Sequence, residues 1–149
     1  MTTENSTNNL ADLADHIAVG QLLNQYTDAL NATDWDVLAS LFTEDAIWRV
    51  ITNGEVEYVQ EGGKNILAFL RDSTATTQAF VQMNHAPVIH LDGERASASS
   101  TMEAIYWFEN GTRQQRFAMY YDEMIRGNDG KWRFTQREFR SKATVTFTE

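Results

Sequence analysis

The chain has 149 residues, of which 42% are hydrophobic and 11% aromatic, and its formal net charge is −9. This length fits one domain with a sizeable core, and the negative charge disfavours nucleic acids and anionic membrane surfaces as partners. The absence of cysteine excludes disulfides, thiolate metal sites and cysteine nucleophiles. Neither a signal-peptide pattern nor a long apolar run occurs, so we expect a cytoplasmic protein without a membrane span.

The N-terminal part of the chain predicts a polar lead-in and two helices. Residues 1–9 are polar, and we expect a flexible segment there, with a single domain over residues 10–149. From Leu10 to Leu30 apolar residues, among them Leu13 and Ile17, recur at helical spacing. A short polar break then separates this helix from a second one that begins near Trp35 and buries residues as far as Phe42.

The middle of the chain predicts a hairpin and a third helix. A strand over residues 46–50 is followed by Asn53-Gly54, a dipeptide typical of tight hairpin turns, and by a second extended segment over residues 56–59. Gly62-Gly63 ends this segment, and the apolar spacing of residues 64–73 predicts a short helix.

The remainder of the chain predicts a sheet. Long extended segments alternate with turns that carry glycine, which favours an antiparallel meander; the four segments cover residues 79–91, 96–108, 116–126 and 131–147. Helices followed by a long antiparallel sheet indicate the α+β class. The sheet must curl around the helices to bury their apolar faces.

Three groups of residues in a fixed order extend over nearly the whole chain. They are the helix–helix–strand segment from Gln25 to Ala46, the strand–turn–strand segment from Val88 to Ala96, and the closing strands from Tyr120 to Arg137. Together they resemble the SnoaL-like branch of the nuclear-transport-factor-like superfamily, which includes scytalone dehydratase, ketosteroid isomerases and hexachlorocyclohexane dehydrochlorinase. The resemblance implies a cone-like α+β barrel, with N-terminal helices packed in a strongly curved, mainly antiparallel sheet around an apolar pocket.

The resemblance also implies a pair of residues for proton transfer. Asp28 matches an aspartate that orients a histidine in these enzymes, and His85 matches the histidine that removes a proton from carbon. A carboxylate beside an imidazole fixes its tautomer and raises its basicity. The interval between His85 and the next turn is shorter than in the dehydrochlorinase, and a strict alignment places Gln82 at the position of the base instead. Tyr26, or another tyrosine of the pocket, would stabilise or protonate the leaving oxygen.

Aromatic residues are expected to form the walls of the pocket. Tyrosine hydroxyls in such a wall can donate a hydrogen bond to a carbonyl or an oxyanion. We predict that the substrate contacts Trp48, Tyr106, Tyr120 and Tyr121. Strand alternation directs Tyr121 away from the face that carries Tyr120, so the two residues lie on different surfaces if the strand is regular.

Other polar residues receive structural interpretations. We expect Asp122 and Arg137 to pair across neighbouring strands, and Arg126, which precedes a turn, to be solvated. His16 and His90 are expected at the surface. No spacing of ligands indicates a metal, and no nucleotide-binding motif is present, so we expect no cofactor.

These features predict a cofactor-independent lyase or isomerase that acts on a small aromatic, polycyclic or terpenoid-like molecule. Dehydration, retro-aldol cleavage and double-bond migration all need the same general acid–base groups. A non-catalytic binding or assembly domain, or the small subunit of a ring-hydroxylating oxygenase, is the alternative on the same fold. We expect a homo-oligomer, a dimer or trimer, with aromatic side chains such as Trp107 or Phe108 at the contact.

Overall fold

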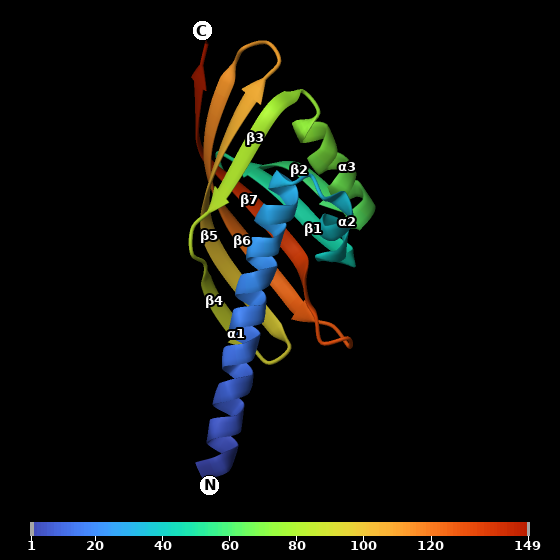
Figure 1. Cartoon of the computed structure of the whole chain (residues 1–149), viewed down its shortest axis with the longest axis vertical. Coiled ribbons are helices and arrows are strands. Elements are labelled where there is room, and N and C mark those ends of the chain that lie inside the picture. Colours follow the sequence, from blue (N-terminus) through green and yellow to red (C-terminus); the bar gives the residue numbers. More distant parts are fainter. Residues whose placement is uncertain (1, 149) are drawn as a thin grey trace.

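The structure is a computed structural model that describes residues 2–148, with side-chain surroundings from residue 9 onward. Within these residues three helices and seven strands follow one another in the order α1 (Thr2–Asn31), α2 (Trp35–Ser40), β1 (Phe42–Thr52), β2 (Glu55–Glu61), α3 (Gly63–Thr74), β3 (Thr77–Asn84), β4 (Val88–Asp92), β5 (Arg95–Phe108), β6 (Arg113–Arg126) and β7 (Trp132–Phe147). Figure 1 shows α1 lying along the sheet, with α2 and α3 beside one end of it. The predicted α+β class is confirmed.

The strands form one sheet in the order β2-β1-β7-β6-β5-β3, with β4 also paired to β5. The C-terminal strands β5, β6 and β7 pair antiparallel, as the turns predict. β1 runs parallel to β7, and this pairing brings the N-terminal hairpin beside the end of the chain. The curvature visible in Figure 1 leaves a concave inner face that the helices partly cover.

Local sequence accounts for several boundaries. Asn53 and Gly54 both have positive φ, 54° and 82°, as the predicted tight turn between β1 and β2 requires. Asp34 caps α2, because its Oδ1 accepts a hydrogen bond from the Val37 N–H at 3.1 Å. The polar break before α2 therefore supplies the residue that fixes the start of this helix.

The expected strand over residues 79–91 is two strands. β3 ends at Asn84 and β4 begins at Val88, and both pair with β5. Pro87 lies in the break and has no N–H to donate to the ladder. The physical consequence is that His85 lies between two strands and not within one.

The first helix is longer than expected and only half of it is covered. It begins at Thr2, although the spacing predicts a start near Leu10, and the flexibility of residues 1–9 stays a prediction. Leu13 and Ile17, expected at the buried face, are each 56% exposed, because here α1 turns its other side, the one that carries Asp15, toward the sheet. Along the C-terminal half a regular stripe is buried: Val19, Leu22, Leu23, Tyr26 and Leu30.

The core is rich in aromatic rings that meet edge to face. Tyr26 of α1 contacts the rings of Phe42 and Phe134, with centroids 6.1 and 6.0 Å apart, a favourable geometry for ring pairs. On the outer face of the sheet Trp107 is exposed, as predicted, whereas Phe108 stacks on Tyr106. A role for Trp107 in subunit contact stays a prediction. Among residues 2–148, no helix is long and apolar enough to cross a membrane.

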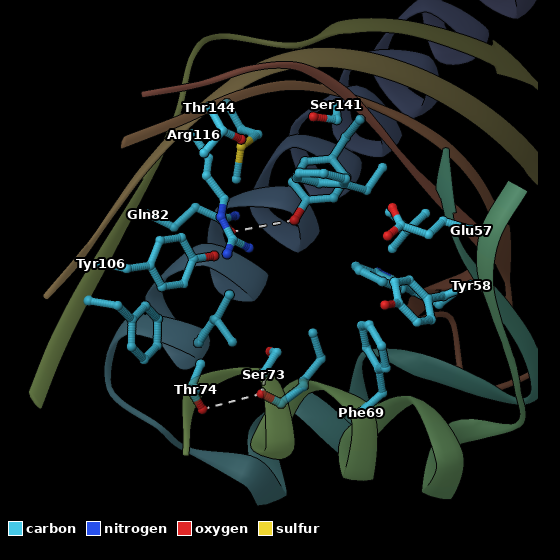
Figure 2. Close-up of a pocket in the computed structure, with 18 of the residues that line it drawn as sticks. Glu57, Tyr58, Phe69, Ser73, Thr74, Gln82, Tyr106, Arg116, Ser141 and Thr144 are labelled. Atoms are coloured by element: carbon cyan, nitrogen blue, oxygen red, sulfur yellow. Dashed lines mark hydrogen bonds between the residues drawn. The ribbon is translucent and has the colours of Figure 1, made fainter. Parts of the chain in front are cut away.

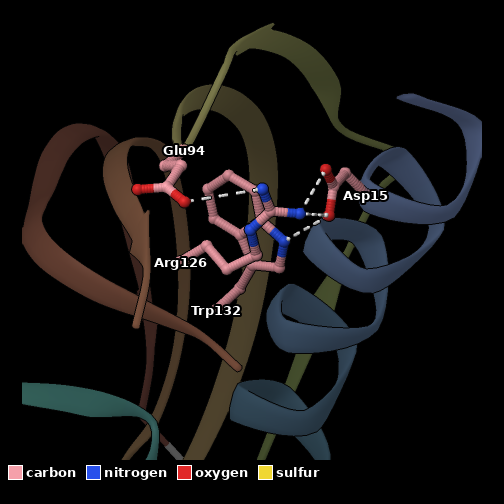
Figure 3. Close-up of polar contacts among 4 residues, drawn as sticks. All are labelled: Asp15, Glu94, Arg126 and Trp132. Atoms are coloured by element: carbon pink, nitrogen blue, oxygen red, sulfur yellow. Dashed lines mark hydrogen bonds and ion pairs between the residues drawn. The ribbon is translucent and has the colours of Figure 1, made fainter. Parts of the chain in front are cut away.

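A cluster of polar contacts fastens α1 to the sheet (Figure 3). The Arg126 Nη1 donates to Asp15 at 2.9 Å, and the Trp132 Nε1 donates to the same carboxylate at 3.1 Å. Arg126 also lies 3.7 Å from a carboxylate oxygen of Glu94. The expectation that Arg126 is solvated is therefore wrong, because α1 passes close to the β6–β7 turn.

Removing the Asp15 carboxylate is expected to loosen this attachment. We predict that Asp15→Ala lowers the free energy of unfolding by about 1–2 kcal/mol, because two donors lose their acceptor at a partly exposed site. Asp12→Ala removes the same charge from an exposed position of α1 and serves as the control. Urea unfolding of the three proteins measures the difference, and equal stability of both variants would contradict the role of Asp15.

Candidate functional site

A cavity of about 450 Å³ lies between the inner face of the sheet, the C-terminal half of α1 and helix α3. Figure 2 shows side chains pointing into it from all sides. Its walls combine polar side chains with apolar and aromatic ones, the latter including Leu30, Trp48, Val50, Tyr58, Phe69, Leu70, Phe80, Met102, Tyr106 and Phe139. Cavities of this size and character bind small organic molecules.

One wall carries a polar corner formed by Tyr120 and Gln82. The Tyr120 hydroxyl donates to the Gln82 Oε1 at 3.4 Å, and both side chains are buried. This hydrogen bond is long, so a ligand oxygen that approaches the hydroxyl can replace it. Both residues line the cavity, and the corner offers donors to an oxygen atom.

The backbone of Gln82 is held by the last residue of α1. The Asn31 Nδ2 donates to the Gln82 carbonyl, and the Gln82 N–H donates to the Asn31 Oδ1, each at 2.8 Å. The amide of Asn31 thus takes the place of a neighbouring strand at the edge of β3. Because strand side chains are perpendicular to these backbone bonds, the clamp fixes the Gln82 side chain toward the cavity.

A buried ion pair lies directly beneath the tyrosines. The Arg137 Nε is 3.3 Å from the Asp122 Oδ1, and both side chains are 0% exposed. The Arg137 guanidinium carbon lies 3.8 and 3.7 Å from the ring centroids of Tyr26 and Tyr120, a distance at which cation–π attraction is strong. The expected pairing of Asp122 with Arg137 is present in the structure.

Burial controls the titration of this group of residues. Loss of hydration raises the pKa of Asp122 to about 6, although the Arg137 charge lowers it. Burial also raises the pKa of Tyr26 and takes the pKa of Tyr120 well above its ordinary value. Both phenols therefore stay protonated at neutral pH and act as hydrogen-bond donors.

Glu57 lines the cavity from β2, on the wall opposite Gln82 (Figure 2). A β-bulge places it there: Val50 pairs with Tyr58 and Ile51 with Val56, which leaves Glu57 without a partner residue on β1. Bulges re-aim side chains in this way. Glu57 is exposed to solvent on its other side, and its carboxylate accepts a hydrogen bond from the Thr52 hydroxyl at 2.7 Å.

The predicted site residues divide into two groups. Tyr26, Trp48, Tyr106 and Tyr120 all line the cavity. Their roles in binding or chemistry stay predictions.

Asp28, His85 and Tyr121 do not line the cavity. Asp28 follows Tyr26 by two residues on α1, about 200° around the helix, and is exposed. His85 is exposed in the break between β3 and β4, where its N–H bonds to the Thr101 carbonyl. The structure does not bring Asp28 and His85 together within the cavity, and Gln82, the alternative from the alignment, faces it instead.

Tyr121 lies on the outer face of the sheet, as strand alternation requires. It is 36% exposed and sits under the Arg140 guanidinium, 4.3 Å from the ring centroid. The predicted substrate contact of Tyr121 is therefore not in the cavity that Tyr120 lines. His16 and His90 are exposed, as predicted.

Sequence reasoning did not single out Asn31, Glu57 and Arg116. Asn31 and Arg116 have no motif around them, and the bulge at Glu57 follows from sheet register and not from composition. Among the side chains that the structure describes, no group of His, Asp and Glu is placed to hold a metal ion.

The fold and cavity define a class: an α+β cone domain with a cavity between its sheet and helices. The SnoaL-like domain model matches residues 11–138, and the chain belongs to this family. A comparison with curated protein sequences finds no match.

Solved structures with the same fold are similar over nearly their whole length. A Novosphingobium aromaticivorans protein named after scytalone dehydratase is 21% identical, covers 93% of this chain and 91% of its own, and superposes with a TM-score of 0.80. A type 2 hexachlorocyclohexane dehydrochlorinase is 15% identical, with coverage of 94% and 93% and a TM-score of 0.84. A type 3 enzyme from Novosphingobium barchaimii is 18% identical, with coverage of 93% and 94% and a TM-score of 0.82. At these identities the likeness shows the fold.

The buried carboxyl of Asp122 gives the site a defined pH dependence. Its pKa in the folded protein lies above its ordinary value of 3.8, so between pH 4 and 6 the folded state binds more protons than the unfolded chain. The stability contributed by this group is therefore present at low pH and is lost as the pH rises through about 6.

We expect the free energy of unfolding of the wild type, relative to that of Asp122→Asn, to fall between pH 4 and pH 7. Chemical unfolding at a series of pH values measures this difference. A difference that rises over the same interval would mean that Arg137 lowers the pKa of Asp122 by more than burial raises it.

Proposed function

We propose that the domain is a cofactor-independent lyase or isomerase for a small, oxygen-bearing aromatic, polycyclic or terpenoid-like molecule. The observation that carries this proposal is the arrangement of the cavity. A hydrogen-bond-donating corner, Tyr120 with Gln82, faces a carboxylate, Glu57, across apolar walls. Proton removal on one side of a substrate and stabilisation of an oxygen on the other are the two requirements of this chemistry.

The walls support an apolar substrate with flat surfaces. Trp48 and Tyr58 both pack against Phe69, with ring centroids 5.2 and 5.4 Å apart, and Phe80 stacks on Tyr106 across the cavity lining. Rings that already contact each other lose little side-chain freedom when a ligand binds. A volume of about 450 Å³ leaves room for a molecule of two or three fused rings.

The oxygen of the substrate is assigned to the Tyr120 corner. A phenol with a raised pKa keeps its proton at neutral pH, and it donates a hydrogen bond to a carbonyl or to a departing hydroxyl. The Gln82 carboxamide, fixed through Asn31, orients that phenol. Tyr26 lies beside it, and its buried hydroxyl has no hydrogen-bond partner in the described part of the chain, so it is a further donor.

Glu57 is assigned the role of general base in place of Asp28 and His85. In a dehydration, its carboxylate takes the proton from the carbon next to the one that bears the hydroxyl. The electrons of that C–H bond form the double bond while the C–O bond breaks, and the hydroxyl takes the phenolic proton of Tyr120 and leaves as water. The Tyr120 phenolate then regains through solvent the proton that Glu57 has taken. In an isomerisation the same carboxylate returns the proton to another carbon, while Tyr120 stabilises the enolate oxygen.

A second candidate function is ligand binding without catalysis. The observation that favours it is the exposure of Asp28 and His85, which leaves the cavity without a histidine base. The names of the similar structures, a dehydratase and dehydrochlorinases, favour the lyase. Turnover by the purified protein distinguishes the two functions.

The test is an assay of hydroxylated and keto-substituted bicyclic and tricyclic compounds, with product formation followed by mass spectrometry. We expect Glu57→Gln to lower kcat by 10²-fold or more and Tyr120→Phe by about 10- to 10²-fold. Both variants are expected to bind the substrate.

Glu55→Gln and Tyr121→Phe are the matched controls, because they change the same groups at positions that do not line the cavity. They are expected to retain wild-type rates. Binding by the wild type without turnover would support the second candidate, and full activity of Glu57→Gln would overturn the assignment of the base.

A further inference from the structure

We infer that Arg116 forms a subsite for a carboxylate, and that the ligands of this domain are aromatic or polycyclic carboxylic acids. The inference rests on the proposed function in one respect, the use of the cavity for an apolar molecule. It adds the chemical class of that molecule.

Arg116 reaches the cavity from the middle of the sheet. In the register of the strands it shares one row with Gln82 of β3 and Thr144 of β7. The residue between Gln82 and Arg116 in this row is Ala104, whose small side chain leaves space above the sheet. The other three residues of this row, Gln82, Arg116 and Thr144, line the cavity. Figure 2 shows Arg116 on the wall opposite Glu57.

The guanidinium of Arg116 is held in place before any ligand arrives. Its carbon lies 4.5 Å from the ring centroid of Tyr106, and its Nε and Nη2 donate to the Gln114 Oε1 at 3.3 and 2.9 Å. These bonds use two of the five N–H groups of the side chain. Three N–H groups remain, including both on Nη1, and can bind a planar anion with two parallel hydrogen bonds.

No carboxylate neutralises Arg116 within the part of the chain that the structure describes. The sequence has 21 acidic residues against 12 basic ones, and four other arginines form ion pairs with them: Arg126, Arg133, Arg137 and Arg140. An arginine that is half-buried, fixed and without an acidic partner is a strong site for an external anion.

The charge of the lining favours a carboxylate over a doubly charged anion. Arg116 is the one cation among the residues that line the cavity, and Glu57 supplies a negative charge on the opposite wall. A phosphate with two charges would be neutralised only in part and repelled by Glu57, whereas one carboxylate is balanced by one guanidinium. The far end of the ligand, near Glu57, must then be neutral.

The test compares acids with their methyl esters, which have nearly the same shape and no charge. The probes are 4-hydroxybenzoic acid, 6-hydroxy-2-naphthoic acid and podocarpic acid, so that one, two and three rings are sampled. Isothermal titration calorimetry measures each acid and its ester with the wild type, Arg116→Gln and Arg116→Lys. Arg113→Gln removes the same charge from an exposed position of β6 outside the cavity and is the control.

We expect at least one acid to bind the wild type ten-fold or more tightly than its ester. The preference should vanish in Arg116→Gln, fall in Arg116→Lys and remain in Arg113→Gln, while thermal unfolding confirms that each variant is folded. Equal affinity for acid and ester, or a preference that survives in Arg116→Gln, would overturn the carboxylate subsite and leave the proposed function standing. Failure of every acid and every ester to bind the wild type would overturn the proposed use of the cavity as well.

Discussion

The structure depends on one buried cation. Arg137 is enclosed in the centre of the domain, in the corner between the rings of Tyr26 and Tyr120 and within 3.3 Å of Asp122. A charge taken out of water costs several kcal/mol unless its surroundings replace the lost hydration. Here one carboxylate and the rings of Tyr26, Tyr120 and Phe134 surround the guanidinium, and within the described residues its nitrogen atoms have no hydrogen-bond partner. Because these groups come from α1, β6 and β7, the burial of Arg137 requires the helix and the closing strands to meet in one arrangement.

This constraint also shapes the cavity. Tyr26 and Tyr120 contact Arg137 with their ring faces and line the inner end of the cavity with their edges. A shift of either ring would therefore remove a cation–π contact from Arg137. On the opposite wall the sheet departs from regular pairing, and the bulge leaves Glu57, an exposed residue, among those that line the cavity. The wall with Tyr26 and Tyr120 supplies hydrogen-bond donors, and the wall with the β1–β2 bulge supplies the Glu57 carboxylate.

The features that depend on local sequence could be predicted, and those that depend on how the elements pack could not. Periodicity and turn residues locate most helices and strands, since Asn53-Gly54 and the turns after β5 and β6 have strong local preferences. Tyr26 follows from the helical spacing of apolar residues in α1, and the opposite faces of Tyr120 and Tyr121 follow from alternation along β6. The division of β3 from β4 at Pro87 is also a local effect, but the long apolar segment around it conceals the break.

The candidate base could not be predicted in this way. Asp28 and His85 have the right chemical types, but their directions are set by helix phase and by the break before β4, and both point outward. Asn31 acquires its place through Gln82, which is 51 residues away in the sequence. Glu57 owes its place to the bulge in the β1–β2 pairing, and Arg116 to the register of β6 against β5 and β7. Residue type alone carries no information on such contacts.

The central claim is that an oxygen atom of the ligand binds at the Tyr120–Gln82 corner. A crystal structure of the domain with 6-hydroxy-2-naphthoic acid tests it most directly. The account predicts the rings between Phe69 and Tyr106, with one ligand oxygen within hydrogen-bond distance of the Tyr120 hydroxyl. A ligand seated instead in the groove on the outer face of the sheet, beside His90 and Tyr121, would contradict it.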